Sequence, residues 1–165
     1  MENPMRTFTI LIANGPNLGH IGRRQPEIYG SRSITELTDM IRELLGPERV
    51  SRIRLDFFQA NGEGQLIDRL EEAMRQGVDG IVLNAGAYTH TSLALADCLA
   101  WIGIPCVEVH LSNILARTDE PLRRTSLIGR SCAGVIAGFG LHSYALGVCA
   151  LWQRFMDTAK PTAKE

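Results

Sequence analysis

The sequence predicts an α/β fold in which helices cover both faces of a parallel sheet. Short apolar runs typical of buried strands alternate along the chain with segments of helical periodicity. Such alternation favours a parallel sheet, and right-handed crossovers place helices on both of its faces. A length of 165 residues and a hydrophobic content of 45% suit one domain with a sizeable core. We therefore expect residues 1–165 to form a single three-layer α/β/α sandwich.

The first half of the chain contains two strand and helix units. Residues 7–13 (TFTILIA) are typical of a buried strand. A capping box at residues 33–36 then predicts a helix whose apolar positions recur at helical spacing until the Gly-Pro pair at residues 46–47 ends it. Residues 50–58 are predicted to be the second strand. A polar turn at residues 61–64 leads into the second helix, which ends at a glycine.

The second half continues the alternation. Residues 80–83 are short and wholly apolar, as expected for a central parallel strand. The later elements are a third helix at residues 91–103, strands at residues 105–109 and 134–137, and a last helix at residues 143–156. Five strands fit the flavodoxin-like arrangement better than a six-stranded Rossmann sheet. Residues 158–165 are expected to fray.

A long irregular loop at residues 14–32 follows the first strand and contains NGPNLGHIGRRQPEIYG. Its glycines allow positive φ, its prolines remove backbone donors, and its asparagines tolerate left-handed turns. Loops of this length in compact domains are usually functional or disordered. The loop is either a lid or a long turn, and it lacks the glycine spacing of a P-loop or a dinucleotide site.

Polar residues collect at the predicted carboxyl ends of the strands, which is where such sheets bind ligands. They are Asn14 and Asn17 after the first strand, Asn84 and residues 88–92 after the third, and Glu108, His110, Ser112 and Asn113 at the fourth. Because Glu108 and His110 are two residues apart on a strand, both side chains point to one face, and the carboxylate can orient and charge the imidazole. This is the arrangement of a general acid.

Each candidate also has a purely structural explanation. The asparagines could cap turns, Glu108 could be an ion-pair partner, and His90 could cap the third helix. Arg23 and Arg24 could form a solvated face, and Tyr29 could anchor the loop. Their convergence on the predicted ligand edge favours a binding site.

The composition argues against several other classes of protein. A net charge of -1 gives no electrostatic reason to expect nucleic acid or an anionic membrane as partner. We expect a cytoplasmic protein, because MENPMRTFTI lacks a signal-peptide pattern and no apolar run reaches roughly 18 residues. The four cysteines lack CxxC spacing and are expected to be buried thiols. With no metal or nucleotide motif, the site is expected to work without a cofactor.

Five segments resemble, in order and spacing, the type II 3-dehydroquinate dehydratases. They are ILIANGPNLGHIGRRQPEIYG, ANGEGQLIDRL, IVLNAGAYTHTSLALAD, PCVEVHLSN and GVIAGFG, in a match that runs from about Thr9 to Tyr144. The resemblance implies a flavodoxin-like fold, dodecamers built from trimers, and dehydration of 3-dehydroquinate to 3-dehydroshikimate without metal or organic cofactor. It also implies that residues 14–32 are an active-site lid.

The resemblance implies anti elimination of water through an enolate. Tyr29 in the lid would take a proton from carbon 2, with Arg24 favouring its phenolate form. Asn17 would hold a water that stabilises the enolate oxygen. His110, oriented by Glu108, would give a proton to the departing hydroxyl on carbon 1.

Further positions match the family's substrate-binding residues. Asn84 matches the residue that holds the departing hydroxyl, Leu111 and Ser112 those that bind the carboxylate, and His90 and Arg123 those that bind the ring hydroxyls. Arg117 matches another arginine of the site, and Asp97 matches the residue that reaches the neighbouring subunit's site. Arg124 is an alternative to Arg123, because LARTDEPLRRTS departs from the family pattern there and holds extra residues. SLIGRSCAG also departs. We expect these changes to alter substrate affinity and not the chemistry.

Other functions stay open from the sequence alone. The same reaction also serves quinate breakdown, and the sequence does not separate that role from shikimate biosynthesis. A non-catalytic flavodoxin-like module that binds a ligand and a flavin or nucleotide binder are further alternatives. A base and an acid on opposite sides of one ligand argue against a mere sensor.

Overall fold

The computed structural model describes residues 6–19, 21, 34–118 and 120–159. In this part of the chain a five-stranded parallel sheet has the order β2-β1-β3-β4-β5. Its strands are β1 (Phe8–Asn14), β2 (Ile53–Gln59), β3 (Gly80–Asn84), β4 (Cys106–His110) and β5 (Gly134–Ala137). This order is the flavodoxin-like one, so the predicted fold class is confirmed.

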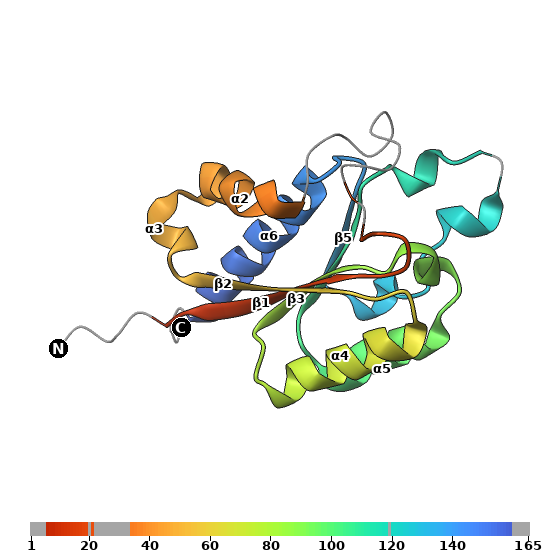
Figure 1. Cartoon of the computed structure of the whole chain (residues 1–165), viewed down its shortest axis with the longest axis horizontal. Coiled ribbons are helices and arrows are strands. Elements are labelled where there is room, and N and C mark those ends of the chain that lie inside the picture. Colours follow the sequence, from red (N-terminus) through yellow and green to blue (C-terminus); the bar gives the residue numbers. More distant parts are fainter. Residues whose placement is uncertain (1–5, 20, 22–33, 119, 160–165) are drawn as a thin grey trace, which may run out of the picture.

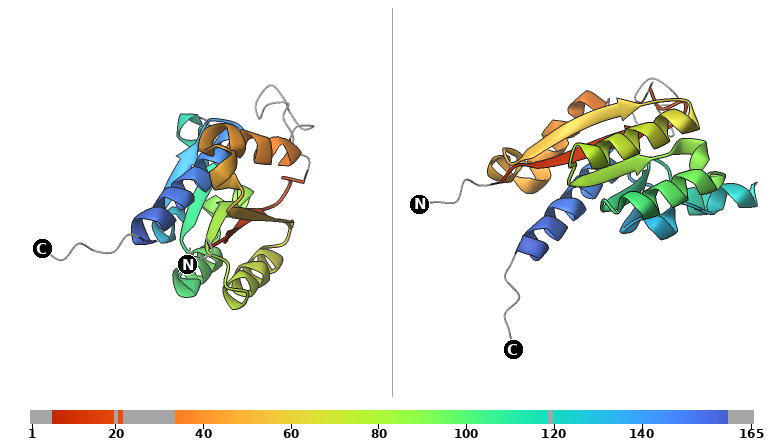
Figure 2. Two further views of the ribbon diagram at one scale, coloured as in Figure 1. Left: turned by 90° about the vertical axis from the view of Figure 1, so that its left-hand side faces the viewer. Right: turned by 90° about the horizontal axis from the view of Figure 1, so that it is seen from below.

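Helices cover both faces of the sheet (Figure 1). One layer consists of α2 (Leu37–Leu45), α3 (Pro47–Val50) and α6 (His142–Ala159), and the other of α4 (Glu63–Arg75) and α5 (Leu93–Ile102). Figure 2 shows α4 and α5 side by side along the sheet. Neighbouring residues of β1 serve opposite layers, because Ile12 packs in one core cluster and Leu11 in the other.

Short 3-10 helices occupy several of the connections. They are η1 (Ile34–Glu36), η2 (Gly86–His90), η3 (Ile114–Ala116), η4 (Pro121–Arg124) and η5 (Gly129–Ser131). No helix in the described ranges has the length and apolar character needed to cross a bilayer.

The second strand begins later than predicted. Residues 50–52 were assigned to it, but Pro47 begins the one-turn helix α3, in which the amide of Val50 donates to the carbonyl of Gly46 at 3.2 Å. Proline favours the first turn of a helix because it lacks the amide hydrogen that would be unpaired there. The third helix also begins later, since the hydroxyl of Ser92 caps it by accepting from the Leu95 amide at 2.9 Å.

The chain segments that leave β1 and β3 approach each other closely. The amide of Gly15 donates to the carbonyl of Asn84 at 2.7 Å, and a Cβ at Gly15 would lie 2.4 Å from the carbonyl oxygen of Ala85. Only glycine permits this approach. It holds the start of the loop at residues 14–32 against the residues that follow β3.

Gly15→Ala should lower stability by about 1 to 3 kcal/mol, because the two backbones must separate to admit the methyl group. Gly64→Ala is the matched control, since a Cβ there would meet no atom within 4 Å. It should be neutral or slightly stabilising in α4. Thermal unfolding at one protein concentration measures both, and a wild-type midpoint for Gly15→Ala would contradict the close approach.

Candidate active site

A pocket of about 170 Å³ lies at the carboxyl ends of the strands, where the loops after β1, β3 and β4 meet. Predicted site residues that line it are Asn17, Asn84, His90, His110, Leu111, Ser112, Arg117 and Arg123. The structure therefore gathers side chains from three separate parts of the sequence. Pro16, Leu18, Ile21, Gly86 and Ala87 complete the lining.

The remaining predicted residues are not among the lining residues in the part of the chain that the structure describes. Arg24 and Tyr29, with the neighbouring Arg23, fall outside the described residues. Asp97 is exposed on α5 and does not line the pocket of its own chain. Glu108 does not line the pocket, but it contacts His110, which does.

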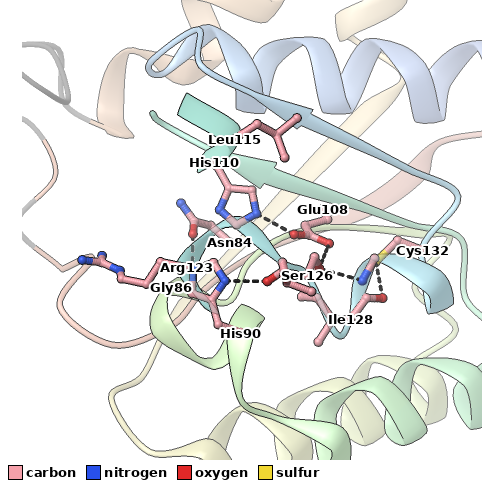
Figure 3. A network of polar contacts seen from close by, with 12 residues as sticks. Asn84, Gly86, His90, Glu108, His110, Leu115, Arg123, Ser126, Ile128 and Cys132 are labelled. Atoms are coloured by element: carbon pink, nitrogen blue, oxygen red, sulfur yellow. Dashed lines mark hydrogen bonds and ion pairs between the residues drawn. The ribbon is translucent and has the colours of Figure 1, made fainter. Parts of the chain in front are cut away.

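Glu108 and His110 form a hydrogen-bonded pair at the end of β4 (Figure 3). The Nε2 atom of His110 lies 2.5 Å from Oε1 of Glu108, so the sequence spacing correctly predicted that the side chains share a face. An ionised carboxylate only accepts hydrogen bonds, which places a hydrogen on Nε2. Nδ1 is then the ring nitrogen that can transfer a proton.

Asn84 is fixed by a buried network beneath the pocket. Its Nδ2 atom donates to the hydroxyl of Tyr144 at 2.9 Å, and that hydroxyl donates to Oδ1 of Asn14 at 2.7 Å. Burial raises the pKa of Tyr144 well above its ordinary value, so the phenol stays protonated. The amide of Gly86 donates to Oδ1 of Asn84 at 3.2 Å. Asn84 therefore has one orientation, and Asn14 has a structural role.

His90 is a buried neutral imidazole. Its Nδ1 atom donates to the carbonyl of Thr125 at 2.7 Å, and its Nε2 atom accepts from Nη1 of Arg117 at 3.3 Å. Burial lowers the pKa of His90, and the charge of Arg117 lowers it further, although the bond to Thr125 acts in the opposite direction. His90 can thus accept a hydrogen bond at its Nε2 atom near neutral pH.

Two arginines make one side of the pocket positive. Nη2 of Arg117 donates to the hydroxyl of Ser112 at 3.2 Å, and Nη1 donates to the carbonyl of Arg123 at 3.3 Å. The Arg123 side chain also lines the pocket, whereas Arg124 is exposed and is not among the lining residues. Guanidinium groups beside a hydroxyl favour binding of a carboxylate.

Asn17 is held in the left-handed region, with φ of 66°. Asparagine tolerates this conformation better than most residues. The backbone amide of Asn17 donates to Oδ1 of Asn61 at 3.1 Å. The side-chain amide of Gln59 supports the turn, because its Nε2 atom donates to Oδ1 of Asn61 at 3.0 Å and to the carbonyl of Gly15 at 3.2 Å. The turn presents the Asn17 side chain to the pocket.

Several other polar residues of this edge have structural roles. The hydroxyl of Tyr88 donates to the carbonyl of Asn61 at 2.9 Å, and Asn113 caps η3 by accepting from the amide of Leu115 at 3.1 Å. Within the described ranges, no group of three or more His, Cys, Asp or Glu side chains is placed to hold a metal ion.

The four cysteines are free thiols. Cys98 and Cys106 are buried as predicted, but the prediction of burial is wrong for Cys132 and Cys149, which are half-buried. Contact with Cys132, together with burial, raises the pKa of the Cys106 thiol, and burial raises those of Cys98 and Cys149. These three groups are therefore protonated near neutral pH.

Comparison with known proteins identifies the family. The sequence model of the family described as "Dehydroquinase class II" matches residues 8–152. The chain belongs to the class II dehydroquinases. The predicted family and enzyme class, a hydro-lyase, are thereby confirmed.

Relatives and solved structures cover most of this dehydroquinase. A 3-dehydroquinate dehydratase of Pelodictyon phaeoclathratiforme is 51% identical over 150 residues, which are 89% of this chain and 93% of the relative. One of Carboxydothermus hydrogenoformans is 48% identical over 142 residues, 86% and 88% of the two chains. The crystal structure of a type II dehydroquinase from Butyrivibrio crossotus matches with a TM-score of 0.78 at 40% identity, covering 88% of this chain and 97% of that one.

Sequence analysis of this dehydroquinase did not single out Tyr144 or Ser126 as supports of the site. Ser126 is 18 residues beyond Glu108, and no motif links the two. The role of Tyr144 could have been predicted from the sequence. A tyrosine on the buried side of a helix needs a partner for its hydroxyl, and a buried asparagine can supply one.

Acidification should destabilise this dehydroquinase partly through His90. Its pKa is lowered by folding, so below the ordinary value of 6.5 the unfolded chain binds a proton that the folded chain resists, and stability falls as the pH falls. Between pH 7 and pH 5, the melting temperature should fall less steeply in His90→Gln than in the wild type. Parallel curves for the two proteins would show that His90 does not contribute.

Proposed function

We propose that this chain converts 3-dehydroquinate to 3-dehydroshikimate by anti elimination of water through an enolate. The observation that carries the proposal is the Glu108–His110 pair, which places a proton donor in a pocket whose arginines favour an anion. 3-Dehydroquinate brings a carboxylate for those arginines and a hydroxyl that must leave with a proton. The names of the relatives, 3-dehydroquinate dehydratase, support the same reaction.

The elimination is proposed to begin at carbon 2, beside the ketone. Tyr29 takes the proton there, and Arg24 favours the phenolate that this step requires. The electrons of the broken bond move onto the ketone oxygen to form the enolate. Asn17, which lines the pocket, holds a water that donates to this oxygen.

The second step is proposed to expel the hydroxyl on carbon 1. The enolate electrons form the bond between carbons 1 and 2 while the bond from carbon 1 to oxygen breaks. Nδ1 of His110 gives the departing oxygen its proton, so that water leaves. Asn84, whose orientation is fixed by Tyr144 and Gly86, holds the hydroxyl in place.

Binding is proposed to use the rest of the pocket. The carboxylate lies against Leu111 and Ser112, with Arg117 beside the Ser112 hydroxyl. His90 and Arg123 contact the ring hydroxyls. Because the single lone pair of the His90 Nε2 atom accepts from Arg117, a ring hydroxyl that donates to this atom would take the place of Arg117.

We place the reaction in the shikimate pathway, which leads to aromatic amino acids, and in the cytoplasm. The free thiols are usual for proteins of that reducing compartment. The same reaction in quinate breakdown would use the same site.

Purified protein mixed with 3-dehydroquinate should produce the ultraviolet absorbance of the conjugated enone product. His110→Ala should lose most turnover but still bind substrate, because the leaving oxygen needs its proton mainly in the transition state. His142→Ala is the matched control, since His142 is exposed at the start of α6, and it should turn over normally. Wild-type turnover in His110→Ala would remove that residue from the mechanism.

We also propose a homo-oligomer, a dodecamer built from trimers, in which α5 lies at a subunit interface. Leu93 and Trp101 on this helix are 56% and 63% exposed, and Asp97 lies between them at helical spacing on the same side. Large apolar side chains on an exposed helix favour contact with another chain. Asp97 would then reach the neighbouring subunit's pocket.

Light scattering should show an oligomer for the wild type and for the conservative variant Trp101→Phe. Trp101→Lys should reduce both the mass and the activity, because a charge in an apolar interface is costly and Asp97 would leave the shared site. A fully active monomer at the assay concentration would contradict the proposal.

A further inference from the structure

Glu108 has a second partner in addition to His110. The carboxylate is fully buried, and its two oxygens have different partners: Oε1 faces Nε2 of His110, and Oε2 accepts from the hydroxyl of Ser126 at 2.7 Å. A buried carboxylate that loses a hydrogen bond retains the cost of its desolvation. The Ser126 hydroxyl therefore supplies part of the hydrogen bonding that compensates for the burial of Glu108.

The direction of this hydrogen bond is fixed by the backbone. The amide of Gly129 donates to the Ser126 hydroxyl at 2.9 Å, so the oxygen of Ser126 already accepts one bond and its hydrogen points to Glu108. Donors thus run in one direction, from Gly129 to Ser126 to the carboxylate. The carboxylate presents its other oxygen to His110.

The packing around the carboxylate is tight. A Cβ at Gly129 would lie 3.0 Å from Oε2 of Glu108 and 3.1 Å from the oxygen of Ser126. The backbone of Gly129 therefore lies close to both side chains, and Oε2 of Glu108 is directed at Ser126. Figure 3 shows Ser126 next to Glu108 on the side away from His110. Rotation of the carboxylate would break both of its hydrogen bonds.

Ser126 acts at a distance from the ligand. It does not line the pocket, and among the contacts described its link to His110 runs through Glu108. We propose that Ser126 is a positioning residue for the dehydration, which fixes Glu108 so that His110 is held with Nδ1 ready to donate its proton. The inference rests on the proposed function and adds Ser126 as a third group to the proton-donating side of the site, behind Glu108 and His110.

Loss of the hydroxyl should lower turnover more than binding. In Ser126→Ala, kcat should fall by about 10- to 100-fold, the order expected for losing a buried hydrogen bond to a charged group, while KM changes by less than about threefold. Ser126→Thr keeps the hydroxyl and should recover most of the kcat. Ser131→Ala is the matched control, because no hydrogen bond described here joins Ser131 to Glu108, and it should retain wild-type kinetics.

A double-mutant cycle tests whether Ser126 acts through Glu108. If it does, adding Ser126→Ala to Glu108→Gln should cost much less in kcat than the same change costs in the wild type. Equal costs in the two backgrounds would overturn the inference. A rise in KM that accounts for the whole loss in kcat/KM would also overturn it. That result would show that the substitution disturbs substrate binding by Arg117 and Arg123, which lie in the same connection, and not the proton transfer.

The assay separates failure of this inference from failure of the proposed function. If the wild-type protein does not dehydrate 3-dehydroquinate, both are overturned. If the wild type is active and Ser126→Ala keeps its kcat, only the role of Ser126 is wrong. Melting temperatures of each variant show whether the protein is folded. If Ser126→Ala fails to fold, Ser126→Cys, which keeps the size of the side chain and weakens its donor, replaces it in the kinetics and in the double-mutant cycle.

Discussion

Glu108 has no exposed surface, and a carboxylate in such a position must be compensated by hydrogen bonds or lose its charge. The compensation comes from two segments, strand β4 and the connection that follows it. His110 is on the same strand, while Ser126 belongs to the connection that leads from η4 to η5. The connection between β4 and β5 must therefore fold back over the strand end before both oxygens of Glu108 have a hydrogen-bond partner. The hydrogen bond between Ser126 and Glu108 thus both completes the site and holds the β4–β5 connection against the end of β4.

A second buried network performs a similar task on the other side of the pocket. Tyr144 on α6 joins Asn14 of β1 to Asn84 of β3, so this helix and the two strands share one set of hydrogen bonds. Both networks place polar groups in an apolar core, where unpaired donors and acceptors are expensive. Because any other orientation would leave a buried group unpaired, the side chains at the pocket keep one orientation before a ligand binds. This is the condition for electrostatic preorganisation.

The sequence was informative wherever local periodicity and spacing decide the structure. Alternation of strands and helices predicted the sheet and its layers, and the spacing of Glu108 and His110 predicted their contact. It failed where a neighbour in space decides. Residues 50–52 have strand-like residues nearby, but Pro47 holds them at the end of a helical turn. Ser126 could not be assigned because its role depends on an 18-residue connection returning to Glu108, and no local pattern encodes that return.

The connection that carries Ser126 also holds the other histidine of the pocket. The carbonyl of Thr125 accepts from His90, and the next residue, Ser126, donates to the partner of His110. The amide of Leu127 donates to the carbonyl of Thr89, beside His90. One short piece of backbone thus sets the positions of two side chains, one from η2 and one from β4. An insertion or a proline at residues 125–127 would therefore disturb both histidines together, because the same three residues carry the contacts of both.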